Sequence, residues 1–338
     1  MNTEFHFYIT GLIAHAAGFS TDEAKTIATA SEFVDENDML FTIEDREGGD
    51  PYEVYISQTM NILKPKRKLM RIYPIFHFVP GDPLCDSACR GDGKMHRLNT
   101  TPDNENANTL MDAAWKAPED VRLHRVGVAT HAYTDTWAHQ NFVGWFDYFN
   151  NIGIDPKPDI GHADAEHHPD WVSHRWEDTR LVEGMVDNNE RFLAAGEALY
   201  GKYRSFLKGR KRGAKLSWRK LRVKLLDATG PSRSGSENWG REKRVENYKA
   251  LAPWLGEFDE DEWFEAAFET DVRGLPDRRF GLASTFSLMK DRYLWREDVE
   301  REDTDWFRFQ EAVKAHQRDA LELLRPTFDK MGVDLHQH

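Results

Sequence analysis

Apolar residues recur every three or four positions along most of this chain, a period typical of helices that bury one face. The first such segment spans residues 5–17 and ends before Gly18, a residue type common after helix C-termini. Ser20 or Thr21 can cap a second helix, which continues to about Val34. The same period predicts further helices at 106–115, 121–148, 179–208 and 304–326.

Residues 39–80 have a different pattern. The stretches MLFTI, YEVYI and RIYPIFHFV are rich in β-branched and aromatic side chains, which favour short strands or extended segments. Helical segments dominate the rest of the 338 residues. The pattern therefore predicts a mainly α fold, a multi-helix bundle in a single domain over 1–338, with short β or extended segments near 39–80.

Charge is unevenly distributed in the C-terminal half. Residues 202–224 carry eleven Lys or Arg and no acidic residue, whereas residues 256–271 carry eight Asp or Glu. Together with the Gly- and Ser-rich segment 229–240 between them, they indicate a charged insertion at 202–275 on the helical body. The basic segment could bind an anionic membrane surface, nucleic acid or the acidic segment, and we favour mutual neutralisation.

The composition of the chain limits its expected partners and cellular location, but it says little about a reaction. The formal net charge of −13 argues against a general affinity for the nucleic-acid backbone. The chain has no run of about 18 apolar residues, so we expect no transmembrane helix. Its first residues lack the basic start and cleavage site of a secretory signal, which makes the cytoplasm the expected location. The two cysteines, Cys85 and Cys89, are expected to be free thiols.

Segment 121–148 carries the most informative polar residues. His131, Asp135 and His139 are spaced four residues apart and would form one slanted stripe on a helix. The two histidines would lie about 12 Å apart along the helix axis, too far for one metal ion to bind both. A carboxylate between them can bridge two ions, so the stripe favours a cluster of two or more metals. The alternative is a long buried helix whose polar side chains are satisfied by neighbouring groups.

Other residue types with affinity for metals lie elsewhere in the chain. Residues 159–170 contain three histidines and four carboxylates in a loop, and His162 and Glu166 would share a face if the turn there were helical. Asp35 follows the second predicted helix, where an acidic side chain is unfavourable beside the negative end of the helix dipole. A turn, contact with solvent or a bound cation would each explain an acidic side chain at this position. His316, by contrast, lies on the apolar stripe of the last predicted helix, and we expect it to be a packed histidine.

The assembled motifs resemble the zinc-dependent phospholipase C superfamily, which includes the fungal single-strand nucleases. HAYTDTWAHQ at 131–140 resembles its central-helix signature, and the HxxxDxxxH form is similar to that of the phospholipase D acting on glycosylphosphatidylinositol anchors. HADAE at 162–166 resembles the HxxxE pair of the superfamily, and FHFYITGLIA at 5–14 resembles its first helix. The chain also resembles an uncharacterised bacterial family with an FHFY-type start and an HAYxDxxAHQ core.

The resemblance implies a helical fold around a trinuclear zinc cluster that cleaves phosphodiester bonds. The implied ligands are Asp35, His77, His131 and Asp135 for one metal, His139, His162 and Glu166 for a second, and His6 with Asp135 for a third. The secreted enzymes use the amine of a processed N-terminal Trp as a further ligand, whereas this sequence starts with Met1. The third metal could therefore be absent or completed by Glu4 or water, and His167 or His168 could replace Glu166.

Residues and resemblance together predict a metal-dependent hydrolase that cleaves a phosphoester of a lipid or a nucleotide with a metal-activated water. Its cofactor would be two or three zinc ions, with manganese or iron as alternatives. Asp135, as the bridge, and Glu166 would be its catalytic residues. Two other classes could use the same side chains: a di-iron or mixed-metal oxygenase, and a non-catalytic interaction protein stabilised by metal. The sequence leaves the substrate and the oligomeric state open.

Overall fold

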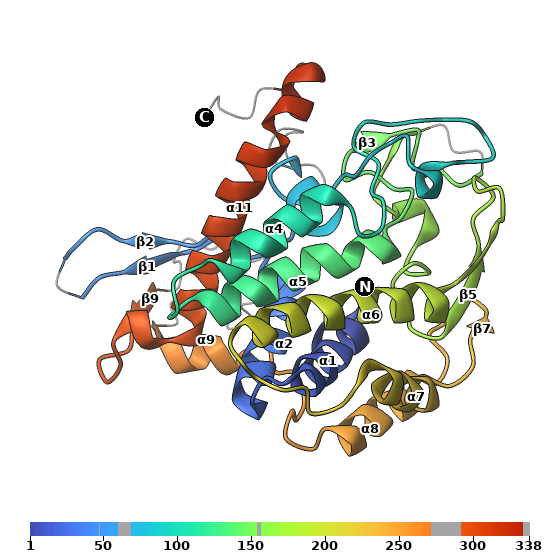
Figure 1. Cartoon of the computed structure of the whole chain (residues 1–338). Coiled ribbons are helices and arrows are strands. Elements are labelled where there is room, and N and C mark those ends of the chain that lie inside the picture. Colours follow the sequence, from blue (N-terminus) through green and yellow to red (C-terminus); the bar gives the residue numbers. More distant parts are fainter. Residues whose placement is uncertain (47, 60–68, 154–156, 272–291, 334–338) are drawn as a thin grey trace.

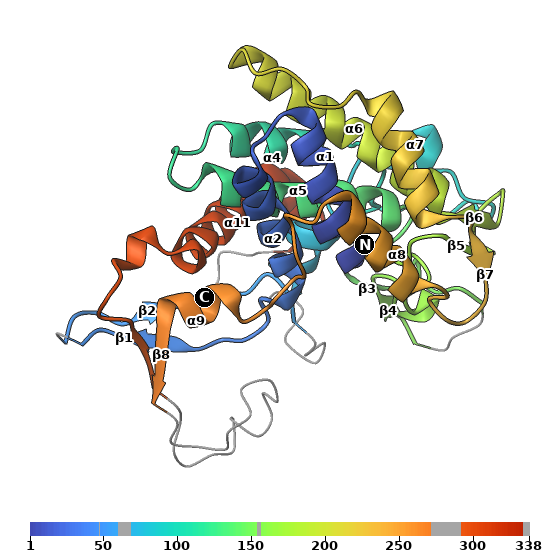
Figure 2. The same ribbon diagram turned by 90° about the horizontal axis from the view of Figure 1, so that it is seen from below.

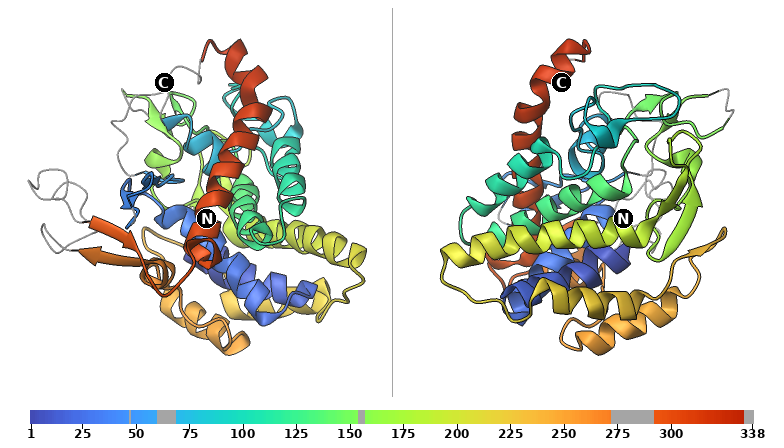
Figure 3. Two further views of the ribbon diagram at one scale, coloured as in Figure 1. Left: turned by 90° about the vertical axis from the view of Figure 1, so that its left-hand side faces the viewer. Right: turned by 45° about the vertical axis from the view of Figure 1, so that its right-hand side comes forward.

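Helix α5 (Arg122–Ala138) occupies the middle of the molecule. In the computed structural model (Figure 1), it packs against α2 (Thr21–Glu36), α4 (Glu105–Trp115), α6 (Asn188–Gly209) and α11 (Asp305–Lys330). Figure 3 shows α11 running along one side of these helices and projecting beyond them at its C-terminal end. The structure describes residues 1–46, 48–59, 69–153, 157–271 and 292–333.

Helices α5 and α2 approach each other closely at Gly127. A side-chain carbon at this position would lie 2.4 Å from Cβ of Ala30 and 2.7 Å from the carbonyl oxygen of Ile27. Only a glycine leaves room for this crossing. The close approach brings the C-terminal end of α2 beside the second half of α5, where His131 contacts the carbonyl oxygen of Ser31 at 2.8 Å.

The first two predicted helices are confirmed, with one refinement. Residues Glu4–Ile9 form a π-helical turn, η1, that continues into α1 (Thr10–Ala17). Gly18 ends this helix with a φ of +125°, a conformation that side chains rarely adopt. A capping box between Ser20 and Glu23 begins α2. Both η1 and α1 pack against α2, which holds the N-terminal segment on the helical body.

The predicted bundle with β structure only near 39–80 is wrong, because the fold is mixed α/β, although helix predominates. About 50% of the chain is helix and 9% is strand, and the described residues contain three small sheets. The largest has the strand order β2-β1-β9-β8, with β1 (Thr42–Glu44), β2 (Tyr52–Glu53), β8 (Phe268–Asp271) and β9 (Arg292–Trp295). β1 and β9 pair in parallel, and the other neighbours pair antiparallel.

The two smaller sheets lie on the other side of the helices from the four-stranded sheet (Figure 1). In one, β3 (Phe146–Asp147) pairs with β4 (Asp159–Ile160). In the other, β5 (His174–Glu177) lies between β6 (Met185–Asp187) and β7 (Arg233–Ser234). β5 alternates buried and exposed residues, but the other strands have only two or three residues each, too few for a period-2 pattern to predict them.

The stretch RIYPIFHFV, predicted to be extended, contains a π-helical turn instead, η2 (Tyr73–His77). Residues Pro74–His77 are all buried, and Phe76 stacks on His316 of α11. A run of aromatic and β-branched residues indicates burial in either kind of element, so composition could not separate helix from strand here. The turn packs against α5 and thereby places His77 beside it.

Two predicted helices have different ends in the structure. The helix predicted at 121–148 ends at Ala138, because the chain turns at Asn141, whose φ of +67° is incompatible with a continuing helix. The helix predicted at 179–208 begins later, as α6, where the side chain of Asp187 caps its N-terminus. The predicted residues before it, 179–187, form a turn and β6.

The predicted insertion at 202–275 packs into the body of the molecule, and its last residues, 272–275, lie outside the described part. α7 (Trp218–Thr229) packs against α1 and α6, and α8 (Arg241–Leu251) packs against α7 and η1 (Figure 2). Leu221 of α7 belongs to the same hydrophobic core as α1, α2 and α5. The segment is therefore part of the surface that covers the N-terminal helices.

The charged segments form ion pairs with other parts of the chain. Arg212 pairs with Glu23 at 2.6 Å, and Glu262 of α9 (Glu262–Ala267) pairs with Lys25 at 2.9 Å. Neither pair joins the basic segment to the acidic one. Within the described residues, every helix is too short or too polar to cross a lipid bilayer. The exposed positions of α7 include four basic residues, Arg219, Lys220, Arg222 and Lys224, together with Val223 and Asp227.

Candidate metal centre

The carboxylate of Asp135 lies at the centre of a buried group of histidines. It projects from the last turn of α5 and is 1% exposed. Its Oδ2 atom is 3.2 Å from His131 Nε2, 3.5 Å from His139 Nδ1 and 3.6 Å from His77 Nδ1. Its Oδ1 atom is 3.1 Å from His6 Nε2. The two oxygens thus face different histidines, an arrangement that suits a bridging carboxylate.

Asp35, in the last turn of α2, completes the first group of donor atoms. Its Oδ1 atom is 3.5 Å from His77 Nδ1 and 3.6 Å from His131 Nε2. Donor atoms of His77, His131 and Asp135 lie within 4.8 Å of one another, as do those of His6, Asp35 and His131. Four elements of the fold, η1, α2, η2 and α5, therefore bring these side chains together at distances that leave room for a metal ion.

A second group of donor atoms is formed by His139, His162 and Asp170. The Oδ1 atom of Asp170 is 3.1 Å from His139 Nε2, and its Oδ2 atom is 3.2 Å from His162 Nε2. The three donor atoms lie within 4.8 Å of one another. The sequence showed Asp170 as one of four carboxylates in its loop, but the resemblance assigned the ligand position to Glu166.

Glu166 does not join this group in the structure. The turn η4 (Ala163–Ala165) is a single 3-10 turn, and Glu166 follows it with a φ of +49°. This conformation places the carbonyl oxygen of Glu166 2.7 Å from His162 Nδ1, while its side chain is exposed. His167 is exposed, and His168 contacts another histidine outside the group. The expected i, i+4 pair of His162 and Glu166 is wrong, because the loop does not form the α-helical turn that it requires.

The backbone nitrogen of Met1 is buried against two carboxylates of the cluster. It contacts Asp135 and lies 3.2 Å from Oδ1 of Asp170. Burial would lower the pKa of this amine, but the charges of Asp135 and Asp170 outweigh burial and raise the pKa to about 11. Glu4, considered from the sequence as a substitute ligand, pairs instead with Arg244 at 2.7 Å.

Backbone carbonyl groups fix the orientation of four of the rings. Each of these rings has one nitrogen within hydrogen-bond distance of a carbonyl oxygen, which can only accept. That nitrogen must therefore carry the proton. The pairs are His131 Nδ1 with Ser31 at 2.8 Å, His77 Nε2 with Ser57 at 2.9 Å, His139 Nδ1 with His77 at 2.6 Å and His162 Nδ1 with Glu166 at 2.7 Å.

The inner nitrogen of each ring then faces another imidazole nitrogen or a carboxylate oxygen, and a neutral ring presents a lone pair there. Burial would lower the pKa of His131, but the charges of Asp35 and Asp135 raise it. His77 Nδ1 and His131 Nε2 are 3.1 Å apart, and the inner nitrogens of His139 and His162 each face an oxygen of Asp170. Burial lowers the pKa of His162, which keeps this ring neutral at pH 7. Contacts between lone pairs are repulsive unless a proton or a metal ion lies between them. The residues therefore fit bound metal ions, with carbonyl groups in the outer positions that orient metal-binding histidines.

His6 adds a further unsatisfied atom to the cluster. Its ring is fully buried and stacks on His131 with the ring centroids 3.8 Å apart. Its Nδ1 atom has no hydrogen-bond partner among the described residues. Burial, together with the charges of His131 and the Met1 amine, lowers the pKa of His6 to about 3, so this ring is also neutral at pH 7.

A cavity of about 800 Å³ lies beside the cluster and is lined by residues of both donor groups together with Tyr73 and Trp171. Glu32 of α2 also lines the cavity. The sequence did not single it out, because it is one polar position among several on an amphipathic helix. Its side chain is 2% exposed; Oε1 accepts a hydrogen bond from Thr3 at 2.6 Å, and Oε2 has no partner among the described residues. Burial and the neighbouring Asp35 carboxylate raise the pKa of Glu32 to about 8.

Comparisons with known proteins give a family for the chain. Neither the curated proteins nor the solved structures contain a match. The family model of DUF6765, a family of unknown function, matches residues 1–324. This range includes both donor groups, the cavity beside them and most of α11. The chain therefore belongs to the DUF6765 family.

Proposed function

We propose that the protein is a metal-dependent hydrolase that cleaves a phosphoester at the cluster around Asp135. The observation that carries this proposal is that imidazole nitrogens and carboxylate oxygens gather in groups whose atoms lie within 4.8 Å of one another. Such groups could hold cations, and two or more cations beside a cavity suit phosphoester chemistry. The resemblance of HAYTDTWAHQ to zinc-dependent phospholipases C and single-strand nucleases supports the same class of reaction.

Two groups of side chains would hold the metals on either side of Asp135. The ligands would be Asp35, His77 and His131 for one ion and His139, His162 and Asp170 for a second. His6 and the nitrogen of Met1 lie where a third ion would contact Oδ1 of Asp135. A mixture of imidazole nitrogens and carboxylate oxygens suits zinc, with manganese or iron as alternatives.

When bound, such ions lower the pKa of a water molecule and polarise a phosphoryl group. Other groups of the chain would orient the metal ligands and donate a proton to the leaving group. The carbonyl groups of Ser31 and Ser57 hold two of the rings with their inner nitrogens toward the cluster. Glu32, which lines the cavity, would carry a proton and deliver it to the alcohol that leaves as the phosphorus–oxygen bond breaks.

The test begins with elemental analysis of protein purified without an affinity tag or added metal. We expect two or three ions of zinc, manganese or iron per chain. Hydrolysis of bis(p-nitrophenyl) phosphate should require these ions, and phosphodiesters of a lipid and a nucleotide would then separate the two substrate classes. His316→Ala is the matched control, because His316 is buried but lies outside both donor groups.

Other results would assign other functions. Bound iron with oxygen consumption and no phosphoesterase activity would make the protein an oxygenase. Bound metal that raises the melting temperature without any turnover would assign a structural role to the cluster. Protein that binds no zinc, manganese or iron when these are added would overturn the metal centre and the hydrolase proposal with it.

A further inference from the structure

Glu4 is a buried carboxylate beside the candidate metal centre that belongs to neither donor group. It lies in η1, two residues before His6, and its side chain is completely buried. Arg244 of α8 pairs with both of its oxygens: Nε lies 2.7 Å from Oε2, and Nη2 lies 2.8 Å from Oε1. A two-point pair of this kind fixes the relative orientation of the two groups as well as their distance.

Arg244 is itself held in place by the loop before α8. Its Nη1 atom donates to the carbonyl oxygen of Trp239 at 2.6 Å, and its Nη2 atom donates to Oδ1 of Asn238. The hydroxyl of Tyr248, one turn further along α8, adds a hydrogen bond to Oε2 of Glu4 at 3.3 Å. Both charges of the pair are therefore buried with further hydrogen-bond partners, the condition under which a buried ion pair is stable.

The ring of His6 lacks the fixation that other rings of the cluster have. Backbone carbonyl groups orient four of those rings, whereas Nδ1 of His6 has no hydrogen-bond partner among the described residues. The ring meets the cluster by stacking on His131 and through Nε2, which lies 3.1 Å from Oδ1 of Asp135. The place of this ring therefore depends on how the backbone of η1 is anchored.

The backbone between Glu4 and His6 couples the positions of the two side chains. The backbone nitrogens of Phe5 and His6 both donate to the carbonyl oxygen of Asn2, at 2.9 and 3.1 Å. The backbone nitrogen of Glu4 donates to the side-chain oxygen of Asn2 at 3.2 Å. These bonds make the stretch one compact turn, so a displacement of the Glu4 carboxylate would move the His6 ring relative to the cluster.

We infer that Arg244 is a positioning residue, which holds His6 in the metal centre by way of Glu4. The inference rests on the proposed metal centre, and it gives α8 a role there although this helix contributes no donor atom to either group. Removing the guanidinium would leave a buried carboxylate without its cation. Such a group takes up a proton or moves toward water, and in either case the two-point contact that fixes Glu4 is lost.

Hydrogen exchange of the metal-free protein, followed by mass spectrometry, tests the anchoring step. Arg244→Gln should speed the exchange of the η1 amides by at least about tenfold and leave the amides of α5 unchanged. Arg212→Gln is the matched control, because Arg212 forms a similar two-point pair with Glu23, at 2.7 and 2.6 Å, at the start of α2. This control should leave the exchange of η1 unchanged.

Competition for zinc with a chromogenic chelator tests the positioning step. Arg244→Gln should lower the affinity for one ion by about tenfold and leave the affinity for the remaining zinc unchanged. The same change should add no further loss in a protein that already carries His6→Ala, because the effect acts through His6. Arg244→Lys keeps the charge but lacks the planar fork, so it should recover part of the affinity.

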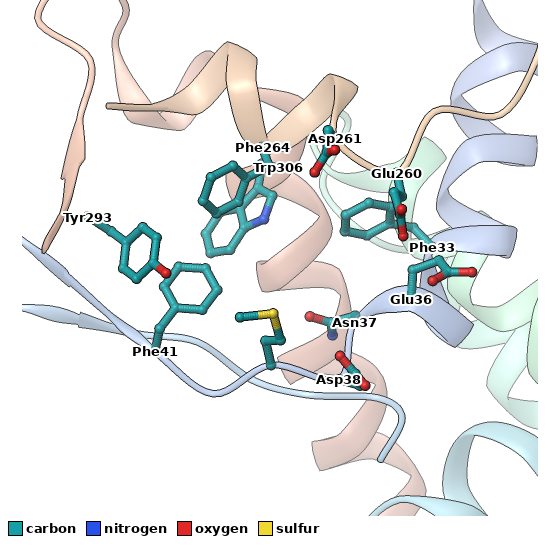
Figure 4. Close-up of a pocket in the computed structure, with 11 residues that line it drawn as sticks. Phe33, Glu36, Asn37, Asp38, Phe41, Glu260, Asp261, Phe264, Tyr293 and Trp306 are labelled. Carbon is teal, nitrogen blue, oxygen red and sulfur yellow. The ribbon is translucent and has the colours of Figure 1, made fainter. Parts of the chain in front are cut away.

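A second control lies in a separate cavity of about 240 Å³ at the C-terminal end of α2, which Figure 4 shows. Its lining includes Phe41, Tyr293 and Glu36, the last of which directly follows Asp35 of the metal centre, but neither Glu4 nor Arg244. Tyr293→Phe should leave both the exchange of η1 and the affinity for zinc unchanged. This result would show that a change near the end of α2 does not in itself disturb the cluster.

Unchanged exchange of η1 in Arg244→Gln, or unchanged zinc affinity, would overturn the inference and leave the metal centre intact. An equal loss of affinity with and without His6→Ala would also overturn it, because it would indicate general destabilisation. If circular dichroism shows that Arg244→Gln does not fold, Arg244→Lys decides: its affinity for one ion should be about threefold lower, and an unchanged affinity would overturn the inference. An unchanged protein that binds no zinc, manganese or iron would overturn both the metal centre and this inference.

Discussion

Helix α5 carries a buried polar network in each half, and among the described residues only the second gathers side chains that could hold a metal ion. In the first half, Arg125 donates hydrogen bonds to Asp319 at 2.8 Å and to Nδ1 of His316. The other nitrogen of His316 donates to the carbonyl oxygen of Ile75 at 3.1 Å. Burial and the charge of Arg125 hold the pKa of His316 well below its usual range, so the ring is neutral. The prediction of a packed histidine at this position is confirmed.

The second half of α5 has similar residue types in a different arrangement. His131 and His139 each use one nitrogen to donate to a backbone carbonyl group, and the other nitrogen faces an imidazole nitrogen or a carboxylate oxygen. A buried histidine is therefore not in itself a sign of a site. What separates the two networks is that the second brings several histidines and carboxylates within 4.8 Å of one another.

The largest difference is expected between Asp135→Asn and His316→Ala. Asp135→Asn should lose bound metal and phosphoesterase activity, because a bridge between ions needs two anionic oxygens. His316→Ala should keep both but lower the free energy of unfolding by about 2–3 kcal/mol, since it leaves a buried hydrogen-bonding group of Arg125 without its partner. Elemental analysis and denaturant unfolding of both variants measure these effects. Full metal content in Asp135→Asn would refute the bridging role.

The next largest effect is expected for Asp170→Asn, which tests whether Asp170 or Glu166 is the metal ligand. Removing the charge that faces His139 and His162 should lower the affinity for one ion by at least about tenfold. Glu166→Gln should leave metal affinity unchanged, because its side chain is exposed. Titration of zinc against a chromogenic chelator measures both affinities. Reduced affinity in Glu166→Gln with unchanged affinity in Asp170→Asn would show that Glu166 is the ligand, as the resemblance implies.

A smaller and pH-dependent effect is expected for Glu32→Gln in metal-free protein. The pKa of Glu32 is about 8 in the folded state against an ordinary value of 4.5, so the folded protein keeps a proton that the unfolded chain releases. The stability from this proton is fully present below pH 4.5 and is lost as the pH rises to about 8. Glu32→Gln removes this loss. The variant should therefore gain stability relative to the unchanged protein between about pH 5 and pH 8.

Urea unfolding in the presence of a chelator, at both ends of this pH range, tests the Glu32 prediction. Glu322→Gln is the control, because Glu322 is exposed and should show the pH dependence of the unchanged protein. A difference in unfolding free energy between Glu32→Gln and the unchanged protein that stays constant across the range would contradict the raised pKa.

The smallest effects are expected for charges outside both networks. Replacing Lys220, Arg222 and Lys224 of α7 by glutamine should leave metal content unchanged and alter the free energy of unfolding by no more than about 0.5 kcal/mol. It should weaken binding to vesicles of anionic lipid by about 1 kcal/mol per charge, an effect that high salt removes. Cosedimentation with vesicles measures this, and single-stranded DNA is the second probe. If the unchanged protein binds neither, these basic residues of α7 serve only to keep that helix hydrated.

Local sequence by itself determined the elements that present the central donors. The spacing of His131 and Asp135 places both on one helical face, because one turn takes 3.6 residues. Ser20 and Glu23 form the capping box that begins α2, the helix that ends beside Asp35. Features of this kind depend on residues within a turn or two of one another, and they can therefore be predicted from the chain.

Tertiary structure alone decided which distant residues complete the sites. Asp170 reaches His162 because the loop turns at Glu166 with a positive φ, and hydrophobic periodicity gives no sign of such a turn. Phe41 and Tyr293 share a cavity because their strands pair across most of the chain. Such contacts depend on burial and hydrogen bonding across the whole fold. They leave no repeating pattern in the sequence around the contacting residues.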